Sequence, residues 1–248
     1  NPGLSLGGTK KLTERFAMGL WIGRAHRSGS LTERFINYFP VGQDPYEMLG
    51  NPMLDPEINN QVDMNLQWNS RTTSLRLDLF AGYLQDIISS IIDTTLTPTL
   101  PTSPGVRRYI NIDKAFKTGF EATWNQQLFA GIHHQFSLAY TYAQDLVRDE
   151  PLPEIAPLDL GYQLSGAYIN KRLRPSISFR HVWEQSRISS EFGETVTPSF
   201  SVIDLGISFQ VIPQLGVSAG VYNLLDTLYH EHLNRSVKGT NPYPIYAP

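Results

Sequence analysis

Residues 62–79 read VDMNLQWNSRTTSLRLDL, and this stretch decides the fold. Apolar and polar side chains alternate from Val62 to Trp68, and the alternation resumes at Leu75 after a short polar break. Successive side chains of a β-strand point to opposite faces, so a period of two describes a strand with one apolar and one polar face. The stretch therefore predicts two adjacent strands joined by a tight turn at residues 70–71.

The same alternation recurs along the chain, and the connections differ in length in a regular way. Short turns alternate with long polar connections, and transmembrane β-barrels have this rhythm because short turns face the periplasm and long loops face outside. A soluble β-sandwich or β-propeller has no reason to place all its long loops at one end. We therefore expect an all-β fold, an antiparallel up-and-down meander of a transmembrane β-barrel. The ten expected strands lie at about residues 3–9, 15–26, 58–69, 72–92, 108–124, 132–146, 160–164, 177–183, 203–209 and 215–221.

Composition narrows the possible functions. The 248 residues carry a formal net charge of -3, so the chain has no basic excess and nucleic acid is not an expected partner. There is no cysteine, which excludes disulfide scaffolds and thiolate metal sites. Residues 28–57 are rich in Pro, Gly, Asn and Asp and follow neither period, so we expect a loop there.

Two segments resemble signatures of the TonB-dependent outer-membrane receptors. Residues 46–57, YEMLGNPMLDPE, resemble the GNPxLxPE signature that leads from an external loop into a descending strand of that family. Residues 221–229, VYNLLDTLY, resemble the family's NLxDxxY box near the upper end of its penultimate strand. The resemblance covers essentially the whole chain.

The resemblance implies an outer-membrane barrel of about 22 strands with an N-terminal plug in its lumen. It also implies a TonB-type energy-transducing partner that acts through the plug. Residues 1–248 would then be a partial barrel domain, the C-terminal part, without the plug and without the last strand. Ten strands alone do not close such a cylinder, and an open edge in lipid leaves backbone groups unpaired.

The expected function is active transport of a scarce nutrient across the bacterial outer membrane, with outer-membrane lipid around the barrel. The implied substrate is a ferric siderophore or another metal complex. The alternative is a non-transporting β-domain, such as an adhesin, a lectin-like module or a passive porin. Phosphate-binding loops, GxSxG and HExxH are absent from the sequence, so we expect no enzyme, no catalytic residues and no cofactor.

His230 and His232 are the best candidate metal ligands. In an extended segment these two side chains point the same way, and imidazoles bind borderline metals. Glu231 between them points away unless the backbone bends. Asn223 and Asp226 of the second signature are expected to make local hydrogen bonds at the strand end.

Several cations are candidates for binding an anionic ligand inside the barrel or at its mouth. A cluster of positive charge would attract an anionic complex such as a ferric siderophore. The competing interpretation is that these cations pair with neighbouring carboxylates, for which Asp78, Asp86, Glu121 and Asp204 are available. The candidate ligand-binding cations are Arg24, His26, Arg27, Arg107 and Arg180.

Overall fold

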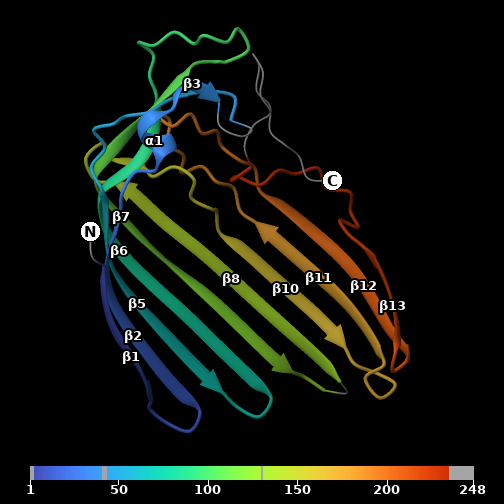
Figure 1. Cartoon of the computed structure of the whole chain (residues 1–248). Helices are drawn as coiled ribbons and strands as arrows, with labels where there is room; N and C mark the ends of the chain where they lie inside the picture. Colours follow the sequence, from blue (N-terminus) through green and yellow to red (C-terminus); the bar gives the residue numbers. More distant parts are fainter. Residues whose placement is uncertain (1–2, 41–43, 130, 235–248) are drawn as a thin grey trace.

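Ten long strands lie side by side in chain order and form one curved sheet in the computed structural model, which describes residues 3–40, 44–129 and 131–234 (Figure 1). Each strand pairs antiparallel with its neighbour on this path, as the alternating sequence predicts. The strands are β1 (Leu4–Lys11), β2 (Phe16–Arg27), β5 (Glu57–Asn69), β6 (Thr73–Ile92), β7 (Val106–Gln127), β8 (Ile132–Asp145), β10 (Asp159–Gly166), β11 (Leu173–Val182), β12 (Phe200–Ile212) and β13 (Leu215–Val221).

The connections confirm the predicted difference in length. Tight turns join β1 to β2, β5 to β6, β7 to β8, β10 to β11 and β12 to β13, and they lie together at the lower end of the sheet in Figure 1. Long connections lie at the opposite end, which we call the loop end. At the β5–β6 turn, the Ser70 hydroxyl accepts a 3.1 Å hydrogen bond from the Thr73 backbone N–H, which closes the reversal locally.

Paired residues show that the two faces of the sheet differ in chemistry. Residues that pair across strands share a face, because neighbouring strands are pleated in phase. One row across five strands is apolar, and the adjacent row is mostly polar. The apolar row consists of Leu66, Leu77, Ala122, Leu138 and Leu160, and the adjacent row consists of Asn65, Asp78, Glu121, Ala139 and Asp159.

No second layer covers the apolar face in the described part of the chain. Leu77 and Leu138 are only partly buried, and Phe179 on the same face is 36% exposed. In water such a surface would need a covering, whereas hydrocarbon chains of a bilayer supply one. The apolar face is thus left uncovered, as the lipid-facing side of a membrane barrel is.

The buried apolar side chains gather at the loop end. Ile112, Ala115, Ala143 and Leu152 form one cluster, where the connection after β8 packs against the ends of β7 and β8. A second cluster contains Val182, Phe200 and Val202, with Tyr229 packed against it. These small cores hold the long connections onto the sheet.

The segment between β2 and β5 contains more structure than the loop that the sequence predicts. It contains α1 (Leu31–Phe35), whose Ser30 and Glu33 form a capping box, and the short strands β3 (Asn37–Pro40) and β4 (Glu47–Leu49). β4 runs parallel to the first residues of β7. These elements are too short for a period to show in the sequence. Another short strand, β9 (Glu150–Pro151), pairs with the end of β8.

Gly50 has a steric role in this segment. A Cβ atom at Gly50 would lie 2.6 Å from the backbone carbon of Arg34, so only glycine allows this close approach. The Arg34 guanidinium donates hydrogen bonds of 2.6 Å to the carbonyl oxygens of Pro52 and Leu54.

Among the described residues, no helix is long and apolar enough to cross a membrane.

Candidate ligand-binding sites at the loop end

The chain after β13 is folded back by Asn223. The Asn223 side chain accepts a 2.9 Å hydrogen bond from the Thr227 N–H and donates one of 3.1 Å to the Thr227 carbonyl. Its own backbone N–H donates to the Asp204 carboxylate at 2.8 Å. Asn223 and Asp226 both adopt positive φ, which short polar side chains tolerate. The predicted local hydrogen bonds of Asn223 are therefore present, and they direct residues 229–234 back over the sheet.

Tyr229 continues this arrangement. Its ring stacks on that of Phe200 with centroids 4.2 Å apart, which attaches the segment to β12. Glu231, two residues later, accepts hydrogen bonds from the Arg180 guanidinium, and Asp159 accepts from the same guanidinium at 2.7 Å. Arg180 is thus held between two carboxylates from different strands and loops.

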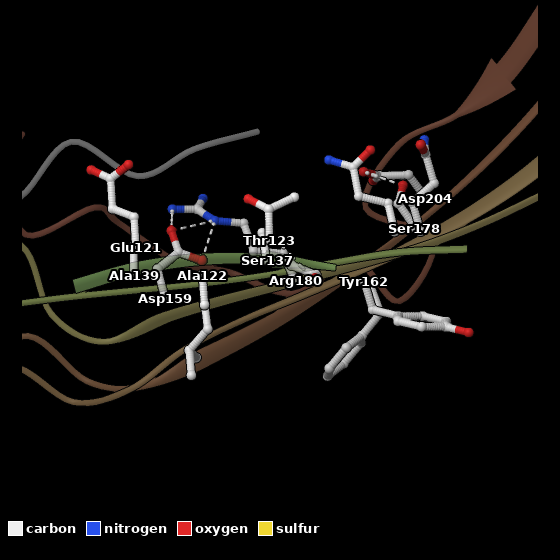
Figure 2. A pocket seen from close by; sticks show the side chains of 15 residues that line it. Glu121, Ala122, Thr123, Ser137, Ala139, Asp159, Tyr162, Ser178, Arg180 and Asp204 are labelled. Carbon is white, nitrogen blue, oxygen red and sulfur yellow. Dashed lines mark hydrogen bonds and ion pairs between the residues drawn. The ribbon is translucent and has the colours of Figure 1, made fainter. Parts of the chain in front are cut away.

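A cavity of about 470 Å³ adjoins Arg180 on the polar face, and we call it the Arg180 cavity. Figure 2 shows Glu121, Asp159 and Arg180 on one side of the sheet and Tyr162 on the opposite side. Three carboxylates, those of Glu121, Asp159 and Asp204, line the cavity together with one guanidinium. The lining is therefore net negative, which favours a neutral or cationic ligand over an anionic one.

A second cavity, of about 310 Å³, is lined by several loop-end segments, and we call it the His232 pocket. His232 comes from the segment after β13, and Glu194 and Thr197 come from the connection between β11 and β12. The His232 side chain is 3% exposed, its Nδ1 lies 2.8 Å from the Thr197 hydroxyl, and its Nε2 lies 3.5 Å from a Glu194 carboxylate oxygen. His230 also lines this pocket.

Backbone groups fix the Glu194 carboxylate. It accepts hydrogen bonds from the N–H of Glu154 at 2.6 Å and of Ser189 at 2.8 Å. Burial raises the pKa of this carboxyl, but His232 and the two backbone N–H groups lower it more, so the pKa lies below its usual value. Burial also lowers the pKa of His230, and neighbouring His232 adds to that effect.

The candidate cations do not come together at one place. Arg27 pairs with Glu57 at 2.6 Å and Glu33 at 2.9 Å. Arg24 and His26, which contact each other at 3.3 Å, lie on the other face of β2, the face that Ile22 shares. The alternation of side chains along β2 predicts this placement, because residues 22, 24 and 26 are two positions apart and therefore share one face of the strand.

Arg107 is buried at the loop end in a closed set of contacts. Its guanidinium lies 4.5 Å from the Tyr46 ring and 4.2 Å from the Phe192 ring, and it contacts the Asp44 carboxylate at 2.7 Å. These contacts join the start of β7 to two connections that are far apart in the sequence. Arg107 therefore has a role in holding the loops, and its side chain also borders the His232 pocket.

Glu47 is a further buried carboxylate, and nothing in the sequence points to it. It accepts hydrogen bonds from the Thr99 N–H at 3.0 Å, the Thr99 hydroxyl at 2.9 Å and the Leu100 N–H at 2.5 Å. Burial raises the pKa of this carboxyl, but the three donors lower it more, so the pKa lies below its usual value. Glu47 thus fixes the connection between β6 and β7 to β4.

The described residues contain no group of three or more histidine or acidic side chains placed to hold one metal ion. His230 and His232 both border the same pocket, but in the described part of the chain no third histidine or acidic side chain is placed to bind one ion together with both of them. Glu194 is the residue of this pocket that sequence reasoning missed. It lies alone in a loop, and only the fold brings it to His232.

The sheet has the features of the wall of a transmembrane β-barrel. It is a single antiparallel layer, its apolar face is uncovered, and tight turns lie at one end and folded loops at the other.

The profile of the family described as TonB dependent receptor-like, beta-barrel matches residues 19–224. The chain belongs to this family of TonB-dependent receptors. The resemblance drawn from the two signatures is confirmed. Proteins of this family are outer-membrane barrels that act as transporters, not enzymes.

Solved structures share the fold over 98% of this chain. The copper transporter OprC superposes with a TM-score of 0.82 at 22% identity, over 37% of its own length. The siderophore receptor PirA from Acinetobacter baumannii superposes with a TM-score of 0.69 at 18% identity, over 39% of its own length. The FrpB iron transporter from Neisseria meningitidis superposes with a TM-score of 0.68 at 15% identity, over 37% of its own length. The chain therefore spans less than two fifths of the length of the structures it resembles.

Proposed function

We propose that this chain forms the C-terminal part of the barrel of an energised importer in the bacterial outer membrane. The match of the receptor family to residues 19–224 carries this proposal. The span of less than two fifths of the similar structures supports a full-length protein with about 22 strands and a plug. A TonB-type protein would supply energy through the plug, and lipid would contact the apolar face.

The cargo in this proposal is a metal complex, either a ferric siderophore or a complex of another metal. The similar structures, which include a copper transporter, an iron transporter and a siderophore receptor, support this class. The net negative lining of the Arg180 cavity favours a complex that is neutral or cationic. Of the five candidate cations, we assign cargo contact to Arg180, because it borders that cavity on the polar face.

The other candidates receive different roles. Arg27 and Arg107 stabilise the loop end through their ion pairs. Arg24 and His26 share the apolar face near the loop end of β2, where cationic side chains reach the polar region of a bilayer.

Growth and uptake measurements test the function. A strain without the gene of the full-length receptor should lose uptake of one labelled metal complex among defined iron, copper, zinc and cobalamin sources. The wild-type gene should restore uptake, and a gene with Asp159→Asn and Glu121→Gln should restore less, because the cavity loses two negative charges. Unchanged uptake of all sources in the deletion strain would contradict the proposal.

A further inference from the structure

The Nε2 atom of His232 is a buried nitrogen in an unusual position. Among the described residues it has no hydrogen-bond partner, although the side chain is 3% exposed. Its contact there is an ion pair with an Oε atom of Glu194 at 3.5 Å, which is longer than the 2.7–3.2 Å typical of an N–H···O hydrogen bond. A buried polar atom without a hydrogen-bond partner destabilises a fold unless something else binds it.

The spacing of these two atoms suits a metal ion. Zinc-class ions bind imidazole nitrogen and carboxylate oxygen at about 2.0–2.2 Å. Two donors at such distances and at a tetrahedral angle stand about 3.4 Å apart. The observed separation of 3.5 Å is close to this value. We propose that His232 Nε2 and the Glu194 carboxylate bind one divalent ion of the zinc and copper class.

The neighbours of both ligands have the arrangement that a metal site requires. The Thr197 hydroxyl, 2.8 Å from Nδ1, orients the imidazole and leaves Nε2 directed at Glu194. The two backbone N–H groups of Glu154 and Ser189 hold the carboxylate. A ligand shell supported in this way is already positioned before the ion arrives.

The remaining coordination positions face the His232 pocket. No third histidine or acidic side chain of the described residues completes the shell, so water or an exogenous donor takes those positions. The pocket of about 310 Å³ provides the space for them. The ion joins the segment after β13 to the connection between β11 and β12. This site stands independently of the proposed transport, because its test measures binding to purified protein.

Calorimetric titration of the purified full-length protein in detergent tests the site, after removal of metals with a chelator. The titrations use ZnCl₂ and CuCl₂. The His232→Gln and Glu194→Gln variants should each bind one ion fewer than the wild type, or should bind that ion at least 10-fold more weakly. Thr197→Val should weaken binding about 10-fold, because the imidazole loses its orienting partner. His230→Gln and His26→Gln should bind as the wild type does.

Equal stoichiometry and affinity in the wild type and in both ligand variants would overturn the proposal. Loss of the ion in His230→Gln would also overturn it, because the ion would then be held by a pair of histidines. Paramagnetic resonance of the Cu²⁺ complex of the wild type gives an answer that does not depend on the folding of a variant. One coordinated imidazole at this site is expected, and two would contradict the proposed ligands.

Discussion

On the polar face of the sheet, close packing around Trp21 determines which residue fits opposite it. A Cβ atom at Gly7 would lie 2.1 Å from the Trp21 side chain and 2.7 Å from the Leu20 carbonyl oxygen. A side chain can move, but the backbone oxygen of a paired strand cannot move cheaply. Gly7, which pairs with Trp21 across the strands, therefore leaves the space that the indole occupies against β1.

Gly7→Val should destabilise the folded barrel by about 1–3 kcal/mol, since it overpacks this contact. Gly8→Val is the matched control, because a Cβ atom at Gly8 meets nothing within 4 Å. The urea concentration at which the purified full-length protein unfolds in detergent measures both. A midpoint lowered equally by the two substitutions would show that the contact with Trp21 has no special weight.

Glu47 gives a prediction about pH at the same scale. Its pKa is lowered in the folded state, so its contribution is complete above the ordinary value near 4.5 and is lost as the pH falls through the lower folded pKa. Hydrogen exchange at Thr99 and Leu100, corrected for intrinsic rates, should therefore accelerate at acidic pH. In Glu47→Gln the fast exchange should already occur at neutral pH, while the exposed control Glu14→Gln should keep the wild-type profile.

At the scale of an element, strand β6 shows what alternation determines. Leu77 lies on the apolar face and Asp78 on the polar face, where Asp78 contacts Arg76 and Asn65. Leu77→Lys should reduce insertion of the barrel, at a cost of about 2–4 kcal/mol near the middle of the bilayer. Asp78→Asn should have a milder effect. The folded fraction after reconstitution into lipid vesicles measures both, and equal damage would contradict the assigned faces.

The turn after β13 is an element in its own right. Asn223→Ala removes both hydrogen bonds to Thr227, so residues 224–234 should detach from the sheet more often. Limited proteolysis should cut this segment about 5- to 30-fold faster, which corresponds to roughly 1–2 kcal/mol of lost stability. Asn60→Ala on β5 serves as control. A cleavage rate unchanged by Asn223→Ala would show that the contacts of Tyr229, Glu231 and His232 hold the segment without the Asn223 turn.

The sequence allowed the strands, their order and their faces to be predicted, because a period of two is a local signal. The two hydrogen bonds between Asn223 and Thr227 were also predictable, since the two residues are four positions apart. The contacts between loops could not be predicted from the sequence. Glu47 and Thr99 are 52 positions apart, and Thr197 and His232 are 35 apart, so only the folded sheet brings them together. The ligand pair of His232 and Glu194 has no local pattern.

At the scale of the whole molecule, the described sheet has two edges, β1 and β13. Unpaired backbone groups at such edges cannot be satisfied by lipid. Residues 1–248 expressed alone should therefore fail to give a heat-resistant monomer on electrophoresis from detergent, whereas the full-length receptor should give one. A stable monomer from the isolated chain would show that β1 and β13 close on each other.

The parallel ladder between β4 and β7 has a kinetic consequence. It ties residues 47–49 to residues 106–108 of the wall, and the Glu47 hydrogen bonds extend this connection to the next loop. A loop end that is held in place in this way loses little conformational entropy when a solute docks, so association can approach the diffusion limit. Discrimination among solutes then resides in how quickly each one leaves.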